Sequence, residues 1–307
     1  MTLDRHLEEL TQEDKPLRFA TIASLSDMSR AEADKFAVTW AALSLERQRQ
    51  LVKRLVEMAE ENVELDFHLI FLMCLDSEDA QVRENAILGL WEIEDRSLIE
   101  PLIKALTTDV SPKVRSAAAV ALGKFAILAD EDELPEADGA RVRDALMSVL
   151  RNEKETPDVR RRALESAAPF DSHVIREYIR RSYESDDLNQ KSSAIFAMGR
   201  TGETRWLSYL FKELRGLSPV LRFEAANACG ELGDESAVPH LIPLLDDDDL
   251  QVQLAAIRAL GEIGGSTAMR ALQNCIHSDE PAIRDAAREA IDYADAMRNP
   301  LSFRYRA

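Results

Sequence analysis

The chain has 307 residues, 46% hydrophobic and 31% charged, a balance that excludes a disordered chain and a membrane-embedded one. Its formal net charge of −18 argues against nucleic acid and anionic membranes as partners and favours basic proteins or peptides, although acidity also serves solubility alone. The longest apolar run, 69–75, is too short to span a bilayer, and residues 1–10 do not read as a signal peptide. We therefore expect a cytoplasmic protein.

The N-terminal 62 residues carry helix signals but no internal repeat. Ser29 and Glu32 have the spacing of a capping box, and Ser44 precedes a helical pattern that continues to Glu60. A stack of repeats needs an end that shields its apolar core. We therefore expect residues 1–62 to form a helical cap.

Similar ten-residue blocks recur along the rest of the chain. They begin at Val82, Val114, Val159, Gln190, Leu221, Val252 and Ile283. Neighbouring starts are 31 or 32 residues apart, except for one step of 45 residues after the second block. An aliphatic residue usually opens a block, Arg or Lys follows, and a small residue comes four positions after the first. This spacing puts Val114, Ala118 and Leu122 on one helix face.

Helix start signals precede the blocks at a constant distance. The residues three positions before the blocks are Asp79, Ser111, Thr156, Asp187, Ser218, Asp249 and Glu280, and the first six are good N-cap residues. Proline follows at four of these positions, where its missing amide hydrogen costs nothing. Glycines close several blocks, and a second amphipathic segment follows, such as 97–106 or 237–245. Each repeat is therefore predicted to be a pair of helices.

This pattern resembles HEAT repeats of the short, phycobilisome-lyase-like bacterial type, most clearly in SPKVRSAAAVALG from Ser111 and SPVLRFEAANACGELG from Ser218. The resemblance covers residues 63–298. It implies an all-α, right-handed solenoid of about seven helix pairs, with the block helices on its concave side. We expect residues 299–307 to be a C-terminal tail, which is either a docking segment or a frayed end.

An acidic insertion at about 127–140 interrupts the repeat. The segment ADEDELPEADGA, residues 129–140, contains Pro and Gly and accounts for most of the extra length. We expect it to be a protruding loop, either functional or merely tolerated.

No catalytic motif emerges from the sequence. P-loop, HExxH and GxSxG patterns are absent, and the five histidines are isolated from one another. Deoxyhypusine hydroxylases are HEAT enzymes that bind iron through His-Glu pairs, and no His-Glu dipeptide occurs here. Cys74, Cys229 and Cys275 fit structural thiols. We expect no catalytic, cofactor or metal site, and the enzymatic alternative is a bilin lyase, suggested by the repeat type alone.

The third and seventh positions of each block are predicted to point away from the packed face. In the middle of the chain these positions and their neighbours combine apolar and basic side chains, which is typical of protein recognition surfaces. The candidate partner-binding residues are Phe196, Phe223, Leu254, Arg161, Arg162, Arg200 and Arg258. Alternatively, the two phenylalanines fill gaps between repeats.

The basic residues at the second block position have a different prediction. Arg83, Arg115, Arg160, Arg222 and Arg284 are expected to pair with acidic groups of neighbouring repeats, as is common in HEAT proteins. The favoured function is therefore a non-catalytic scaffold or adaptor that binds a protein or peptide on the concave face. The net charge favours a basic partner.

Overall fold

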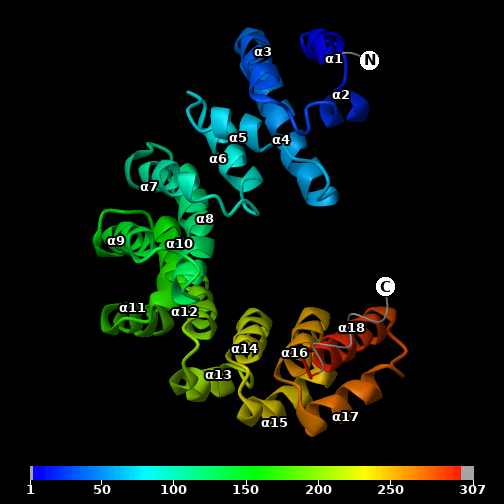
Figure 1. The fold of residues 1–307 in the computed structure, drawn as a ribbon. Helices are drawn as coiled ribbons and strands as arrows, with labels where there is room; N and C mark the ends of the chain where they lie inside the picture. Colours follow the sequence, from blue (N-terminus) through cyan, green and yellow to red (C-terminus); the bar gives the residue numbers. More distant parts are fainter. Residues whose placement is uncertain (1–2, 299–307) are drawn as a thin grey trace. The chain divides into compact units, whose positions relative to one another are not determined.

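The computed structural model describes residues 3–298, and every regular element in that range is a helix (Figure 1). The chain forms two compact units, Met1–Ala163 and Leu164–Ala307. The division falls within helix α10 (Pro157–Ala167). The C-terminal tail proposed from the sequence lies outside the described residues.

The first unit contains nine α-helices and one 3-10 helix before α10 among its described residues. These are α1 (Leu3–Leu10), α2 (Phe19–Ala23), α3 (Arg30–Ala42), α4 (Leu45–Glu61), α5 (His68–Cys74), α6 (Ala80–Gly89), η1 (Arg96–Leu98), α7 (Ile99–Thr108), α8 (Pro112–Asp130) and α9 (Glu136–Arg151). Helices α4, α6 and α8 pack in succession, while α5 packs on α6 and α7 packs on α8.

The second unit repeats this arrangement in a regular form. Its helices are η2 (Ala168–Phe170), α11 (His173–Tyr183), α12 (Leu188–Arg200), η3 (Thr204–Trp206), α13 (Leu207–Glu213), α14 (Pro219–Leu232), η4 (Glu235–Ala237), α15 (Val238–Leu241), η5 (Ile242–Asp246), α16 (Leu250–Ile263), α17 (Gly265–Cys275) and α18 (Pro281–Arg298). Helices α12, α14, α16 and α18 pack one after another, and α11, α13, α15 and α17 each pack on the helix that follows (Figure 1).

The repeat blocks coincide with α6, α8, α10, α12, α14, α16 and α18, which we call the block helices. The helices between them are the intervening helices. The all-helical architecture of helix pairs predicted from the sequence is therefore confirmed.

The helix starts follow the predicted chemistry. The side chains of Asp79, Asp187 and Asp249 accept hydrogen bonds from backbone amides of the first turns of α6, α12 and α16. Ser111 and Ser218 occupy N-cap positions without a side-chain cap bond, and a proline begins the helix after each. The Ser29 capping box is also present. Local capping thus fixes where most block helices begin.

Glycine near the end of a block helix lets the next block helix approach closely. A Cβ atom on Gly230 of α14 would lie 2.9 Å from the Cα atom of Ala259 in α16, and one on Gly199 of α12 would lie 2.8 Å from the Cα atom of Ala228 in α14. The same approach recurs where Gly261 faces Ala290. Backbones at this distance leave no room for any side chain, so the spacing of the row depends on these glycines.

The expected pairing with acidic groups is observed for three of the five second-position arginines. Arg284 instead donates to backbone carbonyls, and the buried Nε atom of Arg160 has no hydrogen-bond partner among the described residues. Arg83 binds Asp109 at 2.7 and 2.8 Å, Arg115 binds Glu155 at 2.7 and 2.9 Å, and Arg222 binds Asp247 at 2.7 and 2.8 Å. Each Arg also donates to backbone carbonyls of the turn before its own helix. Each pair therefore ties two consecutive inter-helix turns together.

This pattern begins one helix earlier than the sequence blocks indicate. Arg49 of α4 binds Asp79 at 2.6 and 3.1 Å, in the same manner as the later pairs. Helix α4 therefore extends the row of block helices, although it lies within the segment expected to be a cap.

The acidic insertion is not the protruding loop that the sequence suggested. Helix α8 continues to Asp130 and α9 begins at Glu136, so the extra residues lengthen two helices. The short link is held down by buried Leu134, whose amide donates to the Leu128 carbonyl at 3.0 Å. The acidic side chains of the insertion lie at the end of α8, in the short link and at the start of α9.

Candidate functional site

The third and seventh block positions lie at the surface, as predicted. None of these side chains is buried, from Glu84 and Leu88 on α6 to Asp285 and Glu289 on α18. Phe196, Phe223 and Leu254 are half-buried on α12, α14 and α16, and Arg258 is exposed. The three apolar side chains are therefore partly available for contact, at equivalent surfaces of successive helices.

One aromatic–cation pair is preformed within the predicted set. The guanidinium of Arg200 lies 5.3 Å from the ring centroid of Phe196, one helical turn away. Its Nε atom is 3.3 Å from the Glu231 carboxylate on the next block helix. The Arg200 side chain is therefore oriented before any partner binds, which lowers the entropy cost of using it in recognition.

Two glutamates missed in the sequence continue this arrangement. Arg200, Glu231 and Glu262 occupy equivalent positions on α12, α14 and α16. Burial raises the pKa of Glu231, Arg200 opposes that rise and the nearby Glu262 adds to it. Burial also raises the pKa of Glu262, against the pull of Arg258. The 31-residue register could have revealed this line of charges, because each residue directly follows one of the closely packed glycines.

Two of the candidate arginines belong to the first unit. Arg161 and Arg162 are half-buried on α10, and the Nε atom of Arg161 is 2.8 Å from the Asp158 carboxylate. The other five candidates lie in the second unit. Among the candidates of the second unit, Phe196 and Arg200 contact each other directly. Phe223 lies on the next block helix, α14, and Leu254 and Arg258 lie on α16.

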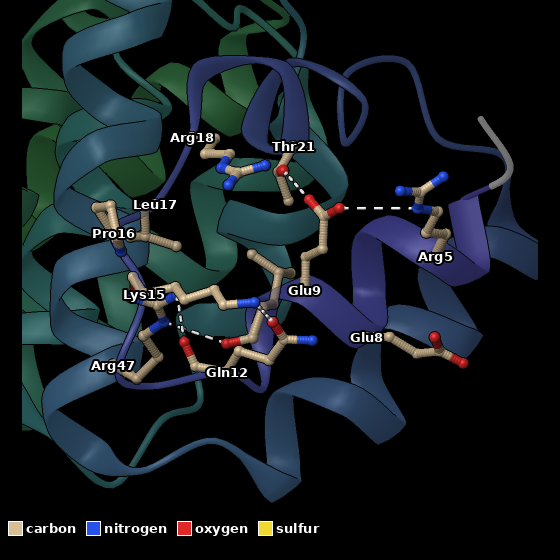
Figure 2. A pocket seen from close by; sticks show the side chains of 11 residues that line it. Arg5, Glu8, Glu9, Gln12, Lys15, Pro16, Leu17, Arg18, Thr21 and Arg47 are labelled. Carbon is tan, nitrogen blue, oxygen red and sulfur yellow. Dashed lines mark hydrogen bonds and ion pairs between the residues drawn. The ribbon is translucent and has the colours of Figure 1, made fainter.

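A polar pocket of about 290 Å³ lies among the first helices of the chain (Figure 2). It is lined by Arg5, Glu8, Glu9, Leu10, Gln12, Lys15, Pro16, Leu17, Arg18, Thr21 and Arg47. Its polar groups largely bind one another. Arg47 is buried and donates to three backbone carbonyls, the Thr21 hydroxyl donates to Glu9 at 2.7 Å, and Lys15 donates to Gln12 at 2.6 Å. The Arg47 bonds fasten the end of α1 and the following loop to α4, and the Thr21–Glu9 bond joins α2 to α1.

A second pocket of about 410 Å³ lies where the turn after α13 meets α15 and η5. The ring of His240 stacks on Phe211 with centroids 4.0 Å apart, and its Nδ1 atom is 2.8 Å from an Arg215 nitrogen. Asp247, on the rim, is bound by Arg222. The charged groups at this rim thus serve the pairing between repeats.

The described residues give little support for metal or thiol chemistry. Between residues 3 and 298, no three His, Cys, Asp or Glu side chains gather as a metal site requires. The three cysteines are free, and burial raises the pKa of Cys74 and Cys229 to about 12, which makes both unreactive thiols. Over the same residues, no helix has both the length and the apolar composition to cross a membrane.

Comparison with known proteins gives curated relatives among deoxyhypusine hydroxylases. Deoxyhypusine hydroxylase-B of Oryza sativa subsp. japonica is 24% identical over 251 residues, which cover 75% of this chain and 82% of the relative. None of the five histidines in this chain is followed by Glu. The likeness therefore does not extend to the His-Glu pairs of those enzymes.

Solved structures share the fold at low identity. Yeast importin-beta (Kap95p) superposes with a TM-score of 0.52 at 13% identity, over 95% of this chain and 46% of the importin. The complex of CpcE and CpcF of phycocyanin lyase from Nostoc gives a TM-score of 0.49 at 19% identity, over 75% of this chain and 94% of that one. The likeness to importin-beta supports the predicted solenoid fold.

The repeat assignment rests on both sequence and structure. A family model described as HEAT repeats matches residues 70–137 and 207–292, and these ranges contain block helices α6, α8, α14 and α16 in full. The helix pairs, the capped block helices and the Arg–acid pairs between turns agree with that match. The chain belongs to the HEAT-repeat family.

Proposed function

We propose that this protein is a non-catalytic scaffold or adaptor that binds a protein or peptide through the block helices of its second unit. The observation that carries the proposal is the set of half-buried Phe196, Phe223 and Leu254 on three successive block helices, with Arg200 stacked on the first ring. Partly exposed aromatic side chains beside an oriented Arg are the usual anchors of protein recognition. Arg258 is included as a charged residue on α16, one turn after Leu254. Arg161 and Arg162 belong to the first unit and stay separate candidates.

The proposal extends to the partner and the compartment. The net charge of −18 favours a partner with basic segments through long-range attraction. Free, buried thiols at Cys74 and Cys229 are consistent with a reducing compartment, so we propose a cytoplasmic location.

The test compares capture of partners by matched variants of the full chain. Phe196→Ala combined with Phe223→Ala is expected to remove the specific partners that the unaltered protein captures from its native cells. Val174→Ala, on the intervening helix α11 and 37% exposed, serves as the control and should capture them normally. A large fall in melting temperature for the double variant would identify the two rings as core residues and would contradict the proposal.

The alternative function, a bilin lyase, can be tested with the same purified protein. Purified protein is mixed with a linear tetrapyrrole and passed through a gel-filtration column. Visible absorbance that co-elutes with the protein, and is lost in the Phe196→Ala/Phe223→Ala variant, would favour the lyase over the scaffold.

A further inference from the structure

The first unit has an apolar surface of its own, independent of the candidate residues above. Leu88 and Trp91 at the end of α6 and Val120 on α8 are 42%, 55% and 48% exposed. Two of them, Leu88 and Val120, are seventh-position residues of successive blocks. We call these three residues the α6–α8 patch.

Hydrogen bonds tie α8 to the segment that follows α6. The ammonium of Lys124 on α8 donates to the carbonyl oxygens of Leu90 at 2.8 Å and Trp91 at 3.1 Å, and also to that of Ile93. Val120 precedes Lys124 by one helical turn and so lies on the same face of α8. The face of α8 that carries Val120 and Lys124 is therefore turned toward the segment after α6.

The backbone beneath the patch is fixed at two points. Gly89 lies directly against the ring of Phe71 on one side of α6, where a Cβ atom would overlap that ring. Just after the end of α6, Lys124 binds the carbonyls of Leu90 and Trp91. Trp91 is thus presented from an ordered position, and a Trp held this way binds with little loss of conformational freedom.

The charges around the patch are mostly acidic. Glu84 lies one turn before Leu88, and Glu92 and Glu94 follow Trp91. Within residues 3–298, no hydrogen bond or ion pair involves the carboxylates of these three residues. Lys124, the cation beneath the patch, binds backbone carbonyls. Burial lowers its pKa to about 8 against the opposing effect of Glu94, so Lys124 offsets only part of the acidic charge. The surroundings of Trp91 therefore favour a cationic partner.

We propose that the α6–α8 patch binds a basic amphipathic segment of another protein, with an apolar side chain against Trp91 and Lys or Arg side chains toward Glu84, Glu92 and Glu94. Charge complementarity selects this occupant. A second copy of a chain with net charge −18 would bring like charge to the patch, and nucleic acid or an anionic membrane would be repelled in the same way.

The position of the tryptophans gives a direct readout. Of the three in the chain, Trp40 is 9% exposed, Trp206 is 1% exposed and Trp91 is 55% exposed. The probe is a 14-residue helical peptide of Leu and Lys, without Trp, added to the full chain at low salt. We expect a blue shift of the emission and protection from acrylamide quenching, both of which disappear in Trp91→Phe while binding measured by anisotropy of the labelled peptide persists.

Affinity variants decide whether the patch itself holds the peptide. Trp91→Ala and Leu88→Ala/Val120→Ala are each expected to weaken binding about tenfold or more, as loss of a recognition anchor does. Glu92→Lys/Glu94→Lys should weaken it and reduce its salt dependence. Val63→Ala, which changes an 81% exposed residue of the same unit, is the control and should bind normally.

Several outcomes would overturn the proposal. The first is that the Leu/Lys peptide binds Trp91→Ala as tightly as it binds the unaltered chain. The second is that a matched Leu/Glu peptide binds the unaltered chain equally well. The third is that the Leu/Lys peptide does not bind at millimolar concentration. Self-association that disappears in Trp91→Ala would identify a second copy as the occupant instead. None of these results depends on Phe196 or Phe223, so the proposed function is tested separately.

Discussion

Glu231 and Glu262 occupy the same position of adjacent repeats but differ in how their charge is compensated. Arg200 forms an ion pair with Glu231 at 3.3 Å, whereas Arg258 affects Glu262 only at longer range. Burial raises the pKa of both carboxyls. A carboxyl whose pKa is raised on folding contributes most stability below its unfolded pKa, and loses that contribution as the pH rises through its folded pKa.

Glu262→Gln is therefore expected to stabilise the protein at neutral pH. The substitution removes a charge that the fold disfavours, and a rise in melting temperature of about 1–2 °C corresponds to a small gain in a chain of this size. The gain should shrink as the pH falls through the raised pKa of Glu262, and it should be absent below the ordinary carboxyl pKa of about 4.5. Thermal unfolding followed by circular dichroism at several pH values measures both effects.

Glu231→Gln provides the matched comparison. It removes the same type of charge but also the ion pair with Arg200, so its gain at neutral pH should be smaller. A larger gain from Glu231→Gln than from Glu262→Gln would contradict this account of the two environments.

The block helices depend on glycine at a point where helix propensity would favour alanine. Gly230 faces the backbone of Ala259, and its missing side chain leaves space that the Glu262 carboxylate also enters. Alanine is favoured over glycine by about 1 kcal/mol inside a helix. The close approach of α14 and α16 opposes that preference here.

Gly230→Ala is expected to destabilise the protein by about 1–3 kcal/mol, because its Cβ atom would overlap the next helix. Urea unfolding of the variant measures this loss. The double variant Gly230→Ala/Glu262→Ala separates the two contacts. If the loss disappears in the double variant, the carboxylate and not the helix backbone limits the space.

At the scale of elements, the sequence predicts what depends on local chemistry. Asp79, Asp187 and Asp249 cap their helices as their positions indicate, and Arg83, Arg115 and Arg222 find their acidic partners. The prediction that the acidic insertion forms a protruding loop is wrong. The burial of Leu134 and the extension of α8 and α9 depend on tertiary packing. Composition alone does not reveal that.

The candidate sites were less accessible to sequence reasoning. Block register predicts Leu88 and Val120 at the surface, where both lie exposed, whereas Phe196 and Phe223 are half-buried. It could not indicate that Lys124 would bind the carbonyl of Trp91 and thereby tie α8 to the segment after α6. Whether Phe196 and Phe223 bind a partner stays a prediction.

On the scale of the whole molecule, two sets of carboxyls respond to acid in opposite ways. Arg49 and Arg222 donate hydrogen bonds that lower the pKa of Asp79 and Asp247 despite partial burial. Burial alone would raise the pKa of Asp109 and Glu155. Hydrogen bonds from Arg83 and Arg115 help to lower both pKa values below the ordinary value. Carboxyls with lowered pKa stabilise the fold above their unfolded pKa, and that stability is lost as the pH falls through their folded pKa.

We therefore expect stability to be greatest at about pH 5, on the acidic side of neutral. Acidification from pH 7 first reduces the repulsion of a chain with pI ≈ 4.8 and protonates carboxyls such as Glu262. Below about pH 4 it then protonates the Arg-bound carboxyls, as ordinary carboxyl pKa values indicate. Melting temperatures from pH 3 to pH 8 measure the curve, and Asp247→Asn should lower the maximum and flatten the acidic side. A stability that falls steadily from pH 7 to pH 3 would contradict this balance.

The contact that Gly199 makes with Ala228 is repeated by Gly230 with Ala259, one 31-residue step along the chain. Each junction between these helices has the same form, so a segment from one junction to the next is an interchangeable cassette. A gene that duplicates or deletes 31 codons in this region would encode a longer or shorter row with every junction intact. Changes of other lengths would place a side chain where glycine is required. The protein's length can therefore evolve in whole repeats, which offers a simple route to binding surfaces of different reach.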